Sequence, residues 1–169
     1  MSFITAQLVM VSPSALTLTD GTQDDTQAIN KAMGTNTTRC GKGCNGSTTK
    51  NAIVYFPPGT YLVSSTIPMP FRTQVIGDAN NRPTLVAAPS FVGLGVLSTD
   101  EYTGEGGAGI DGGDPEYYVY TANFYRQIRN IVIDIRQVTS GSLVTRLHYQ
   151  VAQATSTQNV ELIAAAGSS

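Results

Sequence analysis

The chain has 169 residues, of which 41% are hydrophobic and 13% are charged. This length and composition suit one folded domain and argue against general disorder. A formal net charge of −2 provides no basic field to attract phosphates, so no nucleic-acid partner is expected.

The first 19 residues contain no Asp, Glu, Lys or Arg, yet they are too polar to span a bilayer and lack the basic start of a signal peptide. Residues 1–19 are therefore interpreted as an irregular or non-native leader. Residues 20–169 are interpreted as the folded part, with no membrane segment expected.

A helix is predicted within "DGTQDDTQAINKAM", which begins at Asp20. Asp24 or Asp25 can cap its first turn, where free amides favour a carboxylate. Gly34 then ends the helix. The apolar residues of one helical face are Ala28, Ile29, Ala32 and Met33.

A Thr-, Gly- and Asn-rich loop follows, with Cys40 and Cys44 in "RCGKGC" and glycosylation sequons at Asn36 and Asn45. A structural zinc site needs about four ligands, and one distant histidine cannot complete such a set. No metal or cofactor is therefore expected. The combination favours a Cys40–Cys44 disulfide in a secreted protein, and free thiols in a cytosolic protein are the alternative.

The periodicity changes to that of short strands after Asn51. In "AIVYFPPGTYLV" two strands flank Pro57-Pro58-Gly59, a corner that neither a helix nor a sheet ladder can cross. Further strands are expected in "TQVIGD", "PTLVAA", "GVLST", "RNIVIDI" and "QNVELIA".

Two of these segments resemble each other, because Asn130 and Asn159 each precede a β-branched run. An Asn at such a position can turn the chain and bond to its equivalent one layer away. Strands that return without hairpin dipeptides favour a solenoid, and a strand pair joined by the Pro57-Pro58-Gly59 corner suits one coil of a parallel β-helix. A β-sandwich is the alternative.

"DGTQDDTQAINKA" and "IVYFPPGTYLVSSTI" resemble the opening of the pectate-lyase-superfamily β-helix domain. The resemblance implies an all-β fold, a right-handed parallel β-helix with a short N-terminal capping helix. More narrowly, "QVIGDANNRPTLVAAPSFVG" and "LHYQVAQATSTQNV" are similar to fungal exo-β-1,3-glucanases of glycoside hydrolase family 55. The resemblance implies two β-helix domains side by side in a longer protein. On this interpretation the chain is a truncated N-terminal fragment, and its partner, the second β-helix domain, is missing.

The same resemblance implies a secreted, exo-acting, inverting glycoside hydrolase that releases glucose from β-1,3-glucan, a polysaccharide substrate. The family's catalytic general acid is expected outside this chain, so the fragment alone is predicted to be inactive. Gln150 is a weak candidate for positioning the attacking water, and Gln150 and Gln153 are the candidate substrate-binding residues. The alternatives are a pectin- or uronate-acting lyase or hydrolase on the same fold, or a non-catalytic carbohydrate-binding module.

Other polar residues receive structural interpretations. His148, the only histidine, is expected to be structural, and Asp134 is expected on a solvated face or in a salt bridge. Tyrosines and phenylalanines near the Gly-rich segment are mostly expected to pack the core; they are Tyr102, Tyr117, Tyr118, Tyr120, Phe124 and Tyr125. Acids of the same segment are expected to be solvated; they are Asp100, Glu101, Glu105, Asp111, Asp114 and Glu116.

Overall fold

A computed structural model describes residues 7–11, 20–34, 40, 47, 49–100, 124–139, 144–150 and 153–164. Strands dominate this part of the chain, with one short helix near its start. The elements in chain order are β1 (Gln7–Met10), β2 (Asp20–Asp24), α1 (Thr26–Met33), β3 (Ala52–Phe56), β4 (Thr60–Pro68), β5 (Thr73–Gly77), β6 (Thr84–Ser98), β7 (Gln127–Asp134), β8 (Thr145–His148) and β9 (Ser156–Ile163).

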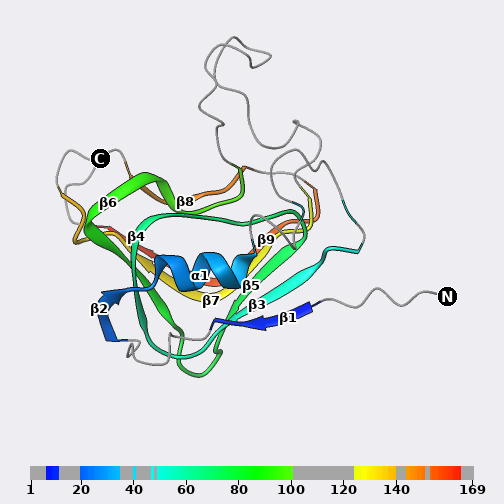
Figure 1. The fold of residues 1–169 in the computed structure, drawn as a ribbon, viewed down its shortest axis with the longest axis horizontal. Helices are drawn as coiled ribbons and strands as arrows, with labels where there is room; N and C mark the ends of the chain where they lie inside the picture. Colours follow the sequence, from blue (N-terminus) through cyan, green and yellow to red (C-terminus); the bar gives the residue numbers. More distant parts are fainter. Residues whose placement is uncertain are drawn as a thin grey trace, which may run out of the picture.

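The strands form one curled sheet in the order β1-β3-β5-β7-β6-β4-β2, with β8 beside β6 and β9 beside β7 (Figure 1). All of these pairings are parallel, and the one antiparallel contact among the described residues is an isolated bridge between Cys40 and Phe71. Two neighbouring parallel strands cannot be joined by a tight hairpin, so the chain needs a long crossover connection between them. Strands close in sequence therefore lie in different parts of the curl.

The predicted proline corner is confirmed. β3 ends at Phe56 and β4 begins at Thr60, and Gly59 takes a φ of 151° that a side chain rarely adopts. After the corner the chain continues along a new direction, because β3 pairs with β1 and β5 whereas β4 pairs with β2 and β6. The corner thus separates two stacks of strands.

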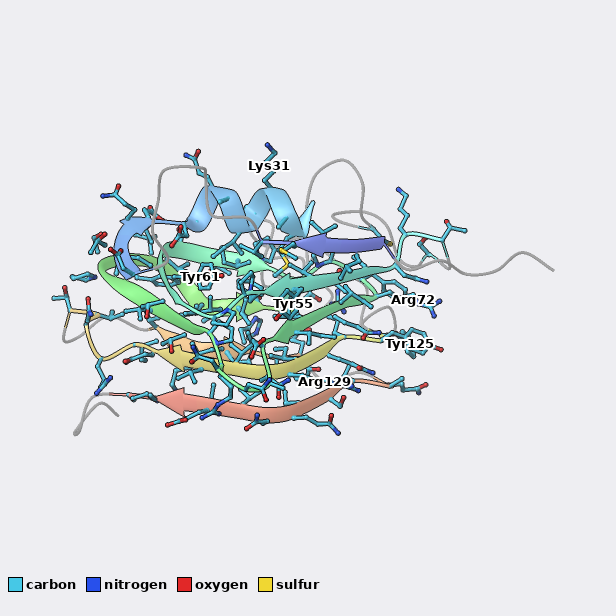
Figure 2. The ribbon with its side chains drawn as sticks, turned by 90° about the horizontal axis from the view of Figure 1, so that it is seen from below. Lys31, Tyr55, Tyr61, Arg72, Tyr125 and Arg129 are labelled. Carbon is cyan, nitrogen blue, oxygen red and sulfur yellow. The ribbon has the colours of Figure 1, made fainter. Side chains whose placement is uncertain are left out.

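Stacking places like residues above one another inside the curl. Val9, Val54, Val75 and Ile128 occupy matching positions on β1, β3, β5 and β7, and the last three are fully buried. In the side view of Figure 2 the strands form successive layers between α1 at one end and β9 at the other. The core is therefore an apolar column that runs through the layers, as expected for an interior packed without voids.

The helix is confirmed, and it begins directly after Asp25, one of the two predicted capping residues. Residues Asp20–Asp24 form β2 against β4, and the helix itself covers Thr26–Met33. Ile29 and Met33 are fully buried, and α1 lies across one end of the curled sheet (Figures 1 and 2). Gly34 ends the helix in the left-handed conformation, with φ 62°, as expected.

An all-β, mostly parallel architecture with one short helix is confirmed, while the closure and right-handedness of a complete β-helix remain predictions. β1 falls within residues 1–19 and pairs with β3, and the division of the chain at residue 20 likewise remains a prediction. In the described residues, no helix is long and apolar enough to cross a membrane.

Candidate functional site

A long irregular strand, β6, shapes a pocket on the described surface. The sequence predicts two strands here, but the structure has one, Thr84–Ser98. Along β4 the pairing advances from Val63 to Ser65, while along β6 it advances from Ala87 to Val92. A second shift follows before Leu97. The surplus residues of β6 are pushed outward, as at a β-bulge.

The outward segment forms one wall of a pocket of about 390 Å³. Two of its wall residues are apolar and exposed, Val92 at 74% and Leu94 at 42%. Gly93 has a φ of 141°, and a Cβ atom on it would meet Thr66 Oγ1 at 2.1 Å, so the close approach of β6 to β4 requires glycine. The lining residues are Ser65, Thr66, Val92, Gly93, Leu94, Ser98 and Asp100.

The floor of the pocket is held by hydrogen bonds between neighbouring layers. Ser98 pairs with His148 on β8, and Ser98 Oγ lies 3.0 Å from His148 Nδ1. Both the Ser98 hydroxyl and His148 Nδ1 bond to the carbonyl of Asp100. These contacts support the structural interpretation of His148, whose ring fixes the chain at the end of β6.

Asp100 corrects an expectation from the sequence. It was predicted to be a solvated loop acid, yet only 3% of the residue is exposed. The reason is its position directly after β6, where Ser98 and His148 bind its carbonyl and hold it against the layer of β8. The other acids of the Gly-rich segment, from residue 101 to residue 116, lie outside the described residues.

The candidate residue Gln150 lies beside this pocket. Its backbone N–H donates to Thr99 Oγ1 over 2.8 Å, and the Thr99 N–H donates to the His148 carbonyl over 3.0 Å. Gln150 is half-buried and is not among the residues that line the pocket. Gln153 is exposed in the turn before β9, where its carbonyl accepts from the Tyr125 N–H over 3.3 Å. The structure thus places Gln150 next to the pocket and Gln153 at another corner of the curl.

That other corner carries the described part of the aromatic cluster. Tyr125 is 46% exposed, and the guanidinium of Arg72 lies 4.5 Å from the centre of its ring. Phe71 is buried and contacts the rings of Phe124 and Tyr125 edge-on. Of the two described residues of the predicted cluster, Phe124 is half-buried and Tyr125 is exposed, so Tyr125 does not pack the core as expected. The tyrosines from residue 102 to residue 120 lie outside the described residues.

The remaining predicted site residues lie partly outside the described residues. Cys40 is buried and disulfide-bonded, whereas Cys44, Asn36 and Asn45 fall in the undescribed part, so the Cys40–Cys44 pairing and the sequons remain predictions. Of the two environments expected for Asp134, the salt bridge is confirmed, since the Arg136 guanidinium lies 2.6 Å from the carboxylate, whereas the solvated face is wrong because the residue is only 7% exposed.

The described lining of the pocket is mostly neutral. It includes the hydroxyls of Ser65, Thr66 and Ser98 and the carboxyl group of Asp100, and the Ser98 hydroxyl already donates to the Asp100 carbonyl. No group of three or more potential metal-ligating side chains occurs within the described ranges. No sequence motif marks the pocket itself, although Gly93 and Gly95 interrupt the strand pattern of β6 and are a usual sign of a bulge.

A stack of parallel strands with a capping helix defines a pectate-lyase-like protein. Residues 17–169 match the family model described as "Rhamnogalacturonase A/epimerase, pectate lyase-like", and the chain belongs to this family.

Among its relatives, a "Probable glucan endo-1,3-beta-glucosidase" of Arthroderma benhamiae is 48% identical over 141 residues, which are 83% of this chain and 15% of that protein. A "Glucan 1,3-beta-glucosidase" of Cochliobolus carbonum is 36% identical over 144 residues, 85% of this chain and 17% of the relative. The predicted resemblance to fungal β-1,3-glucanases is therefore confirmed.

A third relative carries a different name. The "Non-secreted LysM effector LysM19" of Penicillium expansum is 44% identical over 142 residues, 84% of this chain and 11% of that protein. The chain thus spans less than a fifth of the length of each of these three relatives.

A solved structure with a similar chain path is ORF18 of Geobacillus virus E2. It has a TM-score of 0.50 and 20% sequence identity, and the match covers 83% of this chain and 22% of that one. At this identity the likeness concerns the fold alone.

Proposed function

We propose that this chain is the N-terminal β-helix segment of a secreted hydrolase that cleaves β-1,3-glucan. The observation that carries the proposal is the identity of 48% over 141 residues to a fungal protein named as a glucan endo-1,3-β-glucosidase. The 36% identity to a second glucan 1,3-β-glucosidase supports it. A segment this short relative to its homologues supplies scaffold and part of a substrate surface rather than a complete active site.

The proposal includes closure of the curled sheet into a right-handed parallel β-helix. Support comes from the parallel register and from the return of the chain to the same stack after each circuit, as in β1, β3, β5, β7 and β9. Parallel crossovers in proteins are right-handed in about 98% of cases, for reasons of strand twist. A second β-helix domain, carried by another part of the same protein, is the proposed partner.

The proposed reaction is exo-acting and inverting, with release of glucose. Inverting hydrolysis needs one carboxylic acid to protonate the leaving oxygen and a carboxylate to activate water, about 6.5–9.5 Å apart. The catalytic general acid is proposed to lie outside this chain, so residues 1–169 alone are expected to be inactive on laminarin. The proposed role of Gln150 is to hold the attacking water or a sugar hydroxyl, because a carboxamide both donates and accepts hydrogen bonds. Gln153 is proposed as a secondary substrate contact.

A chimera tests the proposed activity. The matching segment of the Arthroderma benhamiae protein is replaced by residues of this chain, and hydrolysis of laminarin is measured with the anomer of the first product followed by NMR. We expect retained hydrolysis, glucose as the product and initial formation of the α-anomer. Production of longer oligosaccharides would contradict exo action, and loss of all hydrolysis in a correctly folded chimera would contradict the proposed function.

The role of Gln150 is tested in the same chimera. Gln150→Ala should lower kcat/KM by about 100-fold, the usual effect of removing one hydrogen bond to the reacting groups. The matched control is Gln158→Ala, because Gln158 is exposed on β9. Equal activity of the two variants would remove Gln150 from the mechanism and leave the substrate assignment intact.

A pectin- or uronate-acting enzyme is the second candidate, since the matching family model is described by rhamnogalacturonase A and epimerase. A non-catalytic carbohydrate-binding module is the third, because a homologous segment occurs in a protein named as a LysM effector. Hydrolysis of rhamnogalacturonan by the chimera, with none of laminarin, would favour the second candidate. Glucan binding without turnover in the folded chimera would favour the third.

A further inference from the structure

Arg72, Tyr125 and Ala154 occupy equivalent positions at one corner of three successive layers. The register of β5 with β7 and of β7 with β9, continued to the residues just before these strands, places Arg72 beside Tyr125 and Tyr125 beside Ala154. All three residues have a positive φ, of 55°, 58° and 56°. The corner thus turns through one left-handed residue in each layer.

Arginine and tyrosine are unusual residues for a left-handed position. Glycine and asparagine adopt a positive φ with less strain, and asparagine fills the other repeated corner at Asn130 and Asn159. The turn itself does not require a long side chain, since alanine occupies the same position in the layer of β9. Strained backbone positions of this kind cluster where a side chain has a function.

The Arg72 and Tyr125 side chains form an ordered pair at the surface. The Arg72 guanidinium lies 4.5 Å from the centre of the Tyr125 ring and covers one of its faces. The rings of Phe71 and Phe124 lie 6.4 Å and 5.8 Å from the same ring, between centroids, and hold it in place. Figure 2 shows Arg72 and Tyr125 at the same end of the strands, one layer apart. The ring is nevertheless 46% exposed, so it is both fixed and open to solvent.

Polar groups without partners surround this ring. Within the described part of the chain, no hydrogen bond involves the Arg72 guanidinium, the Tyr125 hydroxyl or the Gln153 carboxamide. Gln153 is held at this corner because its carbonyl accepts from the Tyr125 N–H over 3.3 Å. In the layer of β9 the position equivalent to Tyr125 carries only the methyl group of Ala154. Among the described layers, a ligand on the side of Tyr125 away from Arg72 would therefore meet no large side chain at that position.

We propose that Arg72, Tyr125 and Gln153 form a contact surface for one pyranose unit of a glucan chain. The C–H groups on the face of a pyranose ring pack against an aromatic ring, while its hydroxyls accept from a guanidinium and exchange hydrogen bonds with a carboxamide. The inference rests on the proposed function for the choice of glucan. It deepens that function, because it gives Gln153 a defined setting at a corner distinct from that of Gln150.

Binding by the 169-residue chain tests the assignment. Laminarihexaose and a galacturonate hexamer are titrated separately, and the backbone and side-chain N–H groups are followed by ¹H–¹⁵N NMR. The signals of Arg72, Tyr125 and Gln153 should shift on addition of laminarihexaose, and their titration gives Kd. Tighter binding of the galacturonate hexamer at this corner would overturn the assignment to a neutral glucan, because an arginine also binds carboxylates well.

Three positions are then substituted. Tyr125→Ala should weaken laminarihexaose binding at least about tenfold because it removes the stacking face, whereas Tyr125→Phe should keep Kd within about threefold. Arg72→Ala and Gln153→Ala should each weaken binding about fivefold, the effect of about one lost hydrogen bond. The matched controls are Lys31→Ala and Gln158→Ala, which alter an exposed cation on α1 and an exposed carboxamide on β9 and should leave Kd unchanged.

A purely structural role of the corner gives a different result. Tyr125→Ala would then lower the urea midpoint but leave the Kd of the folded chain unchanged, which would overturn the proposal. Binding that neither Arg72→Ala nor Gln153→Ala changes would overturn it as well, as would the absence of any shift with laminarihexaose. If Tyr125→Ala does not fold, the Arg72 and Gln153 variants still decide. All of these results leave the proposed function standing, because hydrolysis of laminarin by the chimera decides it separately.

Discussion

At the scale of single residues, left-handed backbone conformations recur at equivalent positions of successive layers. Asn130 and Asn159, with φ of 55° and 51°, stand one above the other on β7 and β9. Asn159 Nδ2 donates to Asn130 Oδ1 over 2.9 Å, and Asn130 Nδ2 donates to the Gly77 carbonyl over 3.2 Å. The sequence predicted this bond between layers, because asparagine tolerates the left-handed region and carries both a donor and an acceptor.

Replacing Asn130 tests how much this ladder contributes. Asn130→Ala should lower the free energy of unfolding by roughly 1–3 kcal/mol, because a positive φ strains the backbone of an alanine and its side chain can make neither hydrogen bond. Asn130→Gly should lose only the hydrogen bonds, about 1 kcal/mol. Urea denaturation of both variants measures the difference. Equal losses would show that backbone strain at this corner is unimportant.

At the scale of elements, α1 begins with two carboxyl groups in opposite situations. Asp24 accepts hydrogen bonds from the Ser64 hydroxyl and the Thr26 backbone, and although burial acts to raise its pKa, these bonds outweigh burial and hold the pKa below its ordinary value. Asp25, the N-cap residue, is 3% exposed and makes no capping bond. Burial raises the pKa of Asp25, and the nearby negative charges of Asp24 and Asp20 add to the effect. Tyr61 on β4 faces the same region, and burial, with a smaller contribution from the Asp25 charge, raises its pKa to about 12.

This contrast gives a pH-dependent prediction. Because the pKa of Asp25 is higher in the native than in the unfolded state, its favourable contribution is present at low pH and is lost as pH rises through the native pKa. Asp25→Asn should therefore raise the free energy of unfolding at neutral pH, and the gain should shrink as pH falls through the raised native pKa and level off below the ordinary value of 3.8.

Asp24→Asn is the matched control, with the opposite sign. Its pKa is lowered in the native state, so the ionised form stabilises the fold above the unfolded value of 3.8 and this stability is lost on acidification. The variant should be less stable than the unsubstituted chain at neutral pH. Thermal unfolding from pH 3 to pH 8 measures both series. A gain for Asp25→Asn that did not depend on pH would contradict the assignment.

At the scale of the whole molecule, the apolar column is covered at one end and exposed at the other. Tyr61, Leu85, Ile133 and Leu162 occupy matching positions on successive strands, and the first three are fully buried whereas Leu162 is 47% exposed. Among the described strands β9 pairs with β7 alone. A strand with one unpaired side and an exposed apolar side chain is a template for association with another chain.

Self-association of the 169-residue chain should therefore depend on β9. We expect Leu162→Lys to weaken association by at least about tenfold in Kd, because a charge on an edge strand opposes further pairing. Sedimentation velocity over a range of protein concentrations measures the effect. Val92→Lys is the control, since Val92 is 74% exposed but lies on the pocket lip. Association that was equal in all three proteins would show that another surface is responsible.

The sequence by itself determined the local features of the fold. Pro57-Pro58-Gly59 has to form a corner because prolines lack donors and glycine accepts positive φ, and the spacing of Ile29, Ala32 and Met33 specifies an amphipathic helix. The repeated Asn130 and Asn159 revealed the layering, since their chemistry suits a bond between equivalent corners. These properties depend on a few neighbouring residues, so they can be recognised without knowledge of the rest of the chain.

Only the tertiary structure decided the pocket and the burial of Asp100. The pocket depends on the register between β4 and β6, which involves residues more than twenty positions apart and is not fixed by the pattern of either strand. Asp100 is buried because β8, far along the chain, brings His148 against it. Such contacts arise when layers stack, and a single sequence does not encode them in any local pattern.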